Sequence, residues 1–235
     1  MLEVYQKLIE AAEAESAYVN RDENGHFILA DRSDLIPEAK ACMARLGETY
    51  PQFRGYYPNA KPIYYAYFFT QQNLLGIYYP HSMEANYNPV VYEYQLPVTI
   101  CHEYTHLKGN IFEDEAGYYG FLACMTSENH DFRYSGYLSA IEWFQPNFGD
   151  DDAAWEQYNE LYNSVSDGLH CDLYTYVPPE YLEEHKKTDE VIPSAIVEQT
   201  AESVMDASLK VNGIPEGTSS YYGMTALLLH YYLNE

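Results

Sequence analysis

Hydrophobic positions recur at helical spacing along most of this chain and give way to short apolar runs in one region. Over 2–18, Leu2, Tyr5, Leu8 and Ile9 alternate with acidic positions, which predicts an amphipathic helix. The same spacing predicts helices over 34–49, 96–108, 111–126, 132–145, 151–164, 166–176, 179–186, 188–211 and 218–233. Residues 62–69, 74–79 and 86–92 are rich in strand formers and predict short strands. The pattern therefore predicts a mainly α (α+β) fold with a small β-sheet of about three short strands beside the helix 96–108.

Nothing in the pattern divides the chain into separate units. No low-complexity linker interrupts it, and 235 residues are enough to form one sizeable core. We therefore predict a single domain over 1–235. It would have N-terminal helices in 1–50, a small sheet in 62–92, two central helices in 96–126 and a C-terminal helical bundle in 131–235.

Composition excludes some partners. The formal net charge is −24 at pH 7, so a basic footprint for nucleic acid is absent and an anionic membrane surface would repel the domain. No apolar run approaches the roughly 18–20 residues needed to span a bilayer.

The 27 tyrosines are expected mostly to pack their rings at the edge of the core, although a few could form an aromatic groove. The four cysteines show no C-x-x-C spacing, which argues against a zinc ribbon.

The helix predicted over 96–108 contains the motif H-E-x-x-H, with His102, Glu103 and His106. Positions i and i+4 share one face of a helix, so both imidazoles can point at one metal ion, and Glu103 can reach a water bound to it. This donor pattern is typical of zinc-dependent peptide hydrolysis. A surface helix that happens to carry two histidines is the alternative. Gly109 is a plausible end for this helix.

A catalytic zinc site needs a third protein ligand. The metzincin pattern would place it at 112, but Phe112 cannot bind zinc. Glu113 is the next candidate, and Glu115 is the fallback. Alternatively, Glu113 could close a capping box with Asn110 at the start of the second helix.

Most of the chain, from about Tyr50 to the C-terminus, resembles a bacterial family known as domain of unknown function 3810, and the resemblance is strongest at 78–140, on the runs 78–124 and 131–140. The E-x-x-A pattern at Glu113 also resembles the third-ligand helix of gluzincin-type peptidases, except that Gly117 stands where those enzymes carry Asp or Asn. The resemblance implies a zinc peptidase domain anchored outside the cytoplasm by transmembrane helices that precede it. Glu84 and Asn86 match a family motif and could line the site, but ordinary turn chemistry would also explain Asn86.

The segment after the second helix offers donors for a developing oxyanion. Arg133 and Tyr134 are the candidates for a catalytic role, and His130 and Tyr137 for lining the site. Each also has a structural interpretation: Arg133 could pair with an acidic helix, and the two tyrosines could simply pack.

We therefore predict a zinc-dependent metallopeptidase in which His102, His106 and Glu113 hold Zn²⁺ and Glu103 is the general base. Its partners would be a peptide or protein substrate and no nucleic acid, and it would contact the membrane only through its anchoring helices. Two other functions stay open: an inactive domain that keeps zinc for structure, and a cell-surface interaction domain that binds no metal.

Overall fold

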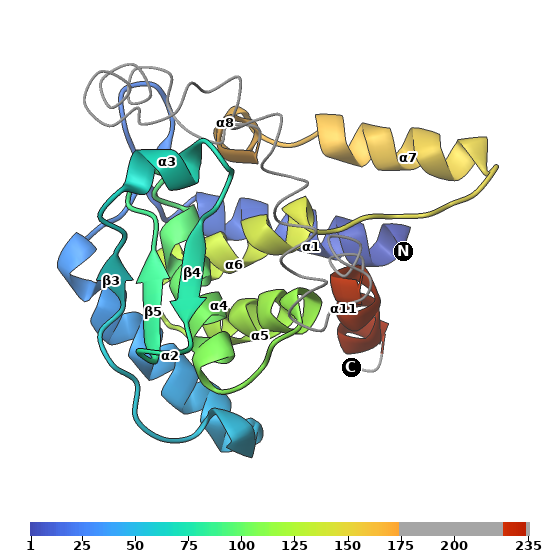
Figure 1. Ribbon diagram of the computed structural model, residues 1–235. Coiled ribbons are helices and arrows are strands. Elements are labelled where there is room, and N and C mark those ends of the chain that lie inside the picture. The colour runs from blue at the N-terminus through green and yellow to red at the C-terminus, as the bar shows by residue number, and fades with distance from the viewer. Residues whose placement is uncertain (174–222, 234–235) are drawn as a thin grey trace.

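The computed structural model describes residues 1–173 and 223–233, and this part of the protein is mainly helical (Figure 1). This confirms the predicted mainly α (α+β) class. The helices predicted over 179–186 and 188–211 lie outside the described residues. The described α-helices are α1 (Leu2–Ser16), α2 (Leu35–Thr49), α3 (Ala66–Thr70), α4 (Gln95–Leu107), α5 (Glu113–Met125), α6 (His130–Glu142), α7 (Asp152–Asn163), α8 (Asp167–Leu173) and α11 (Gly223–Leu233).

A small mixed sheet covers one side of the central helices (Figure 1). It contains β3 (Lys61–Pro62), β4 (Gly76–Tyr79) and β5 (Glu84–Tyr87), in the order β3-β5-β4. β4 and β5 form an antiparallel hairpin in which Ile77 lies opposite Asn86, and β3 pairs with β5 in parallel. The order leaves β4 at one edge of the sheet. A second, two-stranded pair joins β1 (Asn20–Arg21) to β2 (Phe27–Ile28).

The predicted strand over 62–69 is largely wrong. The chain leaves β3 after Pro62 and then forms the short helix α3. Ala66, Tyr67 and Thr70 are the buried residues of α3, and the Thr70 hydroxyl donates to the Val90 carbonyl at 2.9 Å. Aromatic residues favour strands only weakly, so burial of one face against the 88–91 segment selects the helix instead.

Helix α4 lies at the centre of the packing. It contacts the helices α2, α5 and α6 as well as β4 and β5. All of its 13 residues are buried except His102 and His106. A helix buried on nearly every side owes its position to its neighbours, so the two half-buried imidazoles have a fixed direction.

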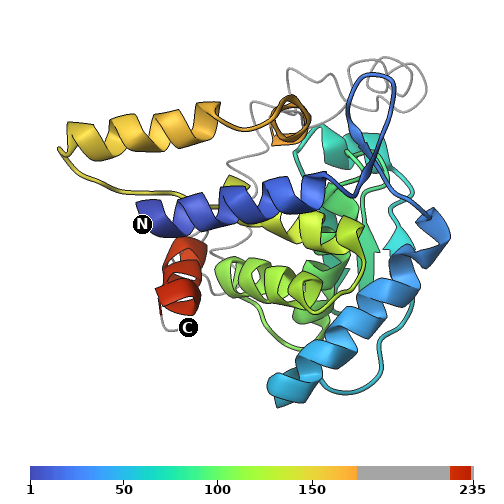
Figure 2. The same ribbon diagram turned by 180° about the vertical axis from the view of Figure 1, so that it is seen from behind.

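The remaining helices surround this centre. Seen from behind, α1 lies along α6, and α7 extends above α1 at the periphery (Figure 2). Tyr5 of α1 packs on Tyr158 of α7 with ring centroids 4.5 Å apart. α11 packs against α5. Within 1–173 and 223–233, no helix is both long and apolar enough to cross a membrane.

Candidate metal centre

After α4 the chain reverses its direction, so that the residues that follow approach the two histidines of α4. α4 ends at Leu107, and Gly109 follows with φ +94°, a left-handed conformation that glycine adopts without a Cβ clash. The Asn110 amide then donates to the Thr105 carbonyl at 3.2 Å. The predicted stop at Gly109 is therefore confirmed, and the reversal leads directly into α5.

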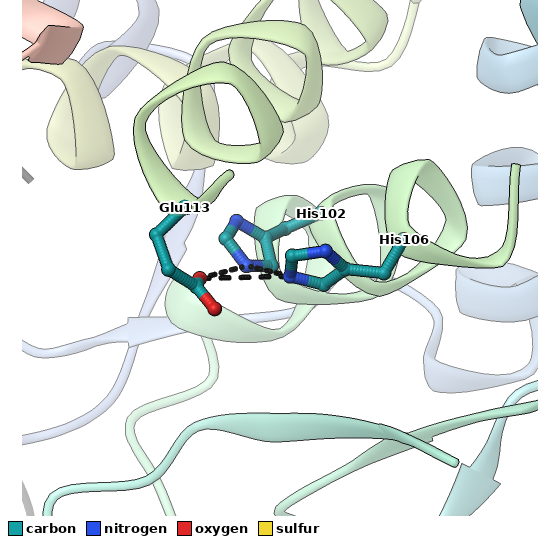
Figure 3. Close-up of side chains that lie close together, drawn as sticks. All are labelled: His102, His106 and Glu113. Atoms are coloured by element: carbon teal, nitrogen blue, oxygen red, sulfur yellow. Dashed lines mark hydrogen bonds and ion pairs between the residues drawn. The ribbon is translucent and has the colours of Figure 1, made fainter. Parts of the chain in front are cut away.

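Close packing of α5 on α4 sets the position of the third side chain. A Cβ at Gly120 would lie 3.2 Å from the His102 backbone nitrogen, so this residue allows the two helices to approach closely. Glu113 is the first residue of α5, two turns before Gly120, and so it lies on the same side of α5. Its carboxylate reaches the two histidines of α4 (Figure 3).

Three possible ligand atoms converge at this point (Figure 3). Glu113 Oε2 lies 3.1 Å from His102 Nε2 and 3.5 Å from His106 Nε2. The two Nε2 atoms are 3.0 Å apart. His102, His106 and Glu113 can therefore hold a metal ion together, as a group of two nitrogen donors and one oxygen donor.

The structure also bears on the capping alternative for Glu113. The residue that caps α5 is Phe112, which makes no side-chain cap hydrogen bond, so the predicted capping box with Asn110 does not form. Instead, the Asn110 carbonyl lies 2.6 Å from His106 Nδ1. An imidazole that donates from Nδ1 to a carbonyl keeps Nε2 available for a metal, so Asn110 orients the ligand. Glu115 does not belong to the cluster.

In the cluster, the negatively charged Glu113 carboxylate lies beside the imidazoles of His102 and His106. Burial alone would raise the pKa of Glu113, but hydrogen bonds from His102 and His106 outweigh it and hold that pKa well below its usual range. Burial would likewise lower the pKa of His106, yet Glu113 raises it to about 9. Burial lowers the pKa of His102. A proton on His106 therefore balances Glu113, and a bound cation would replace that proton.

Glu103 lies on α4 beside the cluster, but its side chain has a different environment. The residue is 5% exposed, and none of the residues that the structure describes forms a hydrogen bond with its Oε2 atom. Burial raises the pKa of this carboxyl to about 8. A buried acceptor without a partner costs free energy, so its presence suggests that a partner from outside the chain, such as a water, completes the site.

Gly76 brings the edge of the sheet to Glu103, which the sequence did not reveal. A Cβ at Gly76 would lie 2.5 Å from Glu103 Oε1 and 2.8 Å from its Cγ, so any larger residue at the start of β4 would displace the Glu103 side chain. A single Gly ahead of an apolar run was the only sequence signal, and such a signal is weak. The edge strand and the general-base candidate are therefore direct neighbours.

The other predicted site residues have partners of their own. Arg133 Nε donates to Glu15 Oε1 at 2.7 Å, and His130 Nδ1 lies 2.7 Å from Glu15 Oε2. The Tyr134 hydroxyl donates to Asp172 at 2.6 Å. Tyr137 packs on Phe121, with ring centroids 6.0 Å apart. The structure thus places these four side chains in contacts that serve packing and pairing, and it joins none of them to the metal cluster.

The two residues from the predicted family motif lie on β5. Ala85 between them is fully buried, and side chains alternate along a strand, so Glu84 and Asn86 face the opposite side of the sheet from Ala85. Glu84 pairs with Lys61, and Asn86 donates to the Ile77 carbonyl at 3.3 Å. The turn proposed for Asn86 is also wrong, because this residue pairs within the sheet.

The comparisons with known proteins give the family. Residues 1–229 match the family model described as "Protein of unknown function (DUF3810)". The chain belongs to this family. The family resemblance is thereby confirmed, while the gluzincin resemblance stays a prediction. No curated protein and no solved structure matched the chain.

Proposed function

We propose that this DUF3810 protein is a zinc-dependent peptidase with its active site at His102, His106 and Glu113. The observation that carries the proposal is the pairing of a three-donor cluster with a buried, unpartnered carboxylate at Glu103. Two imidazoles and one carboxylate are a ligand set that catalytic zinc sites use, and this set leaves a fourth position for water or substrate. In the described residues the cluster has three donors. Structural zinc sites usually have four protein ligands and catalytic sites have three, so this number favours a catalytic site.

Different residues of the chain would carry out different parts of the reaction. When bound, zinc would lower the pKa of a coordinated water and polarise the substrate carbonyl. Glu103 would accept the proton of that water at its unpartnered Oε2 and return it to the leaving amine. The Asn110 carbonyl would hold the ring of His106 in position throughout.

The substrate would bind as an added strand. β4 is an end strand of the sheet, and none of the described strands pairs with its outer edge. An extended peptide can add to such an edge through backbone hydrogen bonds. Since Gly76 at the start of β4 touches Glu103, a peptide bound there would pass the general base.

Attachment to a membrane, which the family resemblance alone implies, stays a prediction.

The test is hydrolysis of a quenched-fluorescent peptide library by zinc-loaded protein. We expect cleavage that a chelator abolishes. Glu103→Gln should retain zinc and lose about 10²- to 10⁴-fold in turnover, because a neutral amide cannot accept the proton. Equal cleavage by wild type and Glu103→Gln would contradict the role of this residue. Zinc binding without cleavage of any peptide would favour the inactive zinc-binding domain, and no zinc binding would favour the interaction domain.

A further inference from the structure

A pocket of about 250 Å³ opens between α3, the segment leading into β4, the start of α4 and the end of α6. Leu74, Leu75 and Val91 form an apolar part of its wall, and Trp143 adds an aromatic surface. Gln95 and Glu142 contribute polar groups. A small apolar pocket with a few polar groups is the usual form of a site for one side chain or small ligand.

The pocket adjoins the metal centre. Leu75 in its wall immediately precedes Gly76, the residue that touches the Glu103 carboxylate. Gln95 and His102 are seven residues apart on α4, so they lie on one face of the helix at a separation of about 10 Å. An extended peptide advances about 3.3 Å per residue, so a long side chain one or two residues from the cleaved bond would reach the pocket.

Thr70, Asn73 and Gln145 also line the pocket, and the acceptors on which the inference depends belong to Gln95 and Glu142. Gln95 is 3% exposed, and its Oε1 atom has no hydrogen-bond partner within 1–173 and 223–233. Glu142 is solvent-accessible, and it accepts a hydrogen bond from the Tyr94 hydroxyl at 2.6 Å. The surrounding protein partly removes water from this carboxylate and raises its pKa to about 7. The described lining contains this one carboxylate and neither Lys nor Arg.

These groups would be satisfied by a cationic, donor-rich side chain. An ammonium or guanidinium would donate to Gln95 Oε1 and Glu142 and would lie against the Trp143 ring, which attracts cations. An apolar side chain of the same length would leave the buried Gln95 Oε1 without a donor from the described residues and would give Glu142 no counter-charge. A site built around buried polar groups rejects ligands that cannot satisfy them.

We propose that this pocket selects substrates with a Lys or Arg side chain next to the cleaved bond. The inference rests on the proposed peptidase function, because it assigns the pocket to the substrate of that site. Gln95 and Glu142 supply the acceptors, and Leu74 and Leu75 contact the aliphatic part of the side chain.

The first experiment measures cleavage of peptides that differ only at one position beside the cleaved bond: Lys, Arg, Gln or norleucine. We expect kcat/KM for Lys and Arg to exceed that for norleucine at least about 10-fold. Glu142→Gln should lower this ratio about 10-fold, whereas Glu128→Gln, the same change at an exposed position, should leave it unaltered. Cleavage without preference for a basic residue would overturn the inference and leave the peptidase proposal intact.

The second experiment does not require turnover. Zinc-loaded Glu103→Gln is titrated with N-acetyl-lysine amide and N-acetyl-norleucine amide while its NMR spectrum is recorded. We expect only the lysine derivative to bind and to shift the Trp143 indole signal, and Gln95→Leu to weaken that binding about 10-fold. Equal binding of both compounds would overturn the pocket assignment. If the lysine derivative binds but zinc-loaded wild type cleaves no peptide, the peptidase proposal is refuted and, with it, the role of the pocket in substrate selection.

Discussion

Two polar clusters in this protein each contain a carboxylate, but they differ in how their atoms are satisfied. In the first cluster, Asp172 is fully buried and accepts hydrogen bonds from Arg21 at 2.7 Å, Tyr134 at 2.6 Å and the Phe27 amide at 2.9 Å. In the second cluster, three possible ligand atoms of His102, His106 and Glu113 face one another, and the neighbouring Glu103 Oε2 has no partner in the part of the chain that the structure describes.

The hydrogen bonds of the Asp172 cluster are complete within the protein, whereas the cluster around His102 can still accept a ligand. Asp172 joins α8 to the β1–β2 pair and to α6, and both of its carboxylate oxygens have protein donors. Such a network stabilises the fold and leaves no atom for a ligand. The metal cluster instead brings three possible ligand atoms together beside Glu103 Oε2, which has no partner among the described residues and costs free energy unless a ligand binds.

The largest expected effect is on metal binding. His102→Ala should reduce zinc affinity at least about 1000-fold, because two remaining ligands cannot hold the ion against water. Isothermal titration calorimetry of zinc into metal-free protein measures it. His170→Ala is the control, since His170 is exposed on α8. Unchanged affinity in His102→Ala would refute the assigned cluster.

The next effect is on stability at the other cluster. Asp172→Ala should cost about 3–5 kcal/mol of unfolding free energy, because it removes one partner of a buried ion pair and leaves Arg21 without its carboxylate. Urea unfolding followed by circular dichroism gives this value. Zinc affinity of the folded variant should equal that of wild type. A stable variant that loses zinc would break the distinction between the two clusters.

A smaller effect is expected at Tyr134, which the sequence had suggested as a catalytic residue. Tyr134→Phe removes the hydrogen bond that the hydroxyl donates to Asp172 and the one that it accepts from Arg21 at 3.1 Å, and it should cost about 1–2 kcal/mol of unfolding free energy. Since Arg21 and the Phe27 amide still satisfy the carboxylate, the fold should persist. Peptide turnover should remain within about 2-fold of wild type, which kinetics on the best library substrate would measure. A loss of turnover without a loss of stability would restore the catalytic role.

Sequence reasoning found the parts of the site that depend on local spacing. The i, i+4 pair on α4, the stop at Gly109 and the proximity of Glu113 all follow from one helix and the turn after it. The start of α5 was placed two residues early, at 111 rather than Glu113, because helix termini leave weak signals without a side-chain cap.

The parts that depend on distant contacts were missed. Arg133 pairs with Glu15, which lies 118 residues earlier, and nothing in the local pattern around Arg133 shows this partner. Gly76 reaches Glu103 only because the β4–β5 hairpin folds onto α4. The 62–69 segment was misassigned for the same reason, since burial of Thr70 against the loop after β5 decides its conformation.

In the proposed zinc site, Glu113 is the third protein ligand beside His102 and His106. Elemental analysis of purified wild type, Glu113→Ala and Glu115→Ala, each dialysed against zinc at neutral pH, tests it directly. We expect about one zinc per chain in wild type and in Glu115→Ala and almost none in Glu113→Ala, because among the described residues only Glu113 places a carboxylate oxygen beside both imidazoles. Full zinc occupancy in Glu113→Ala, or no zinc in wild type, would contradict it.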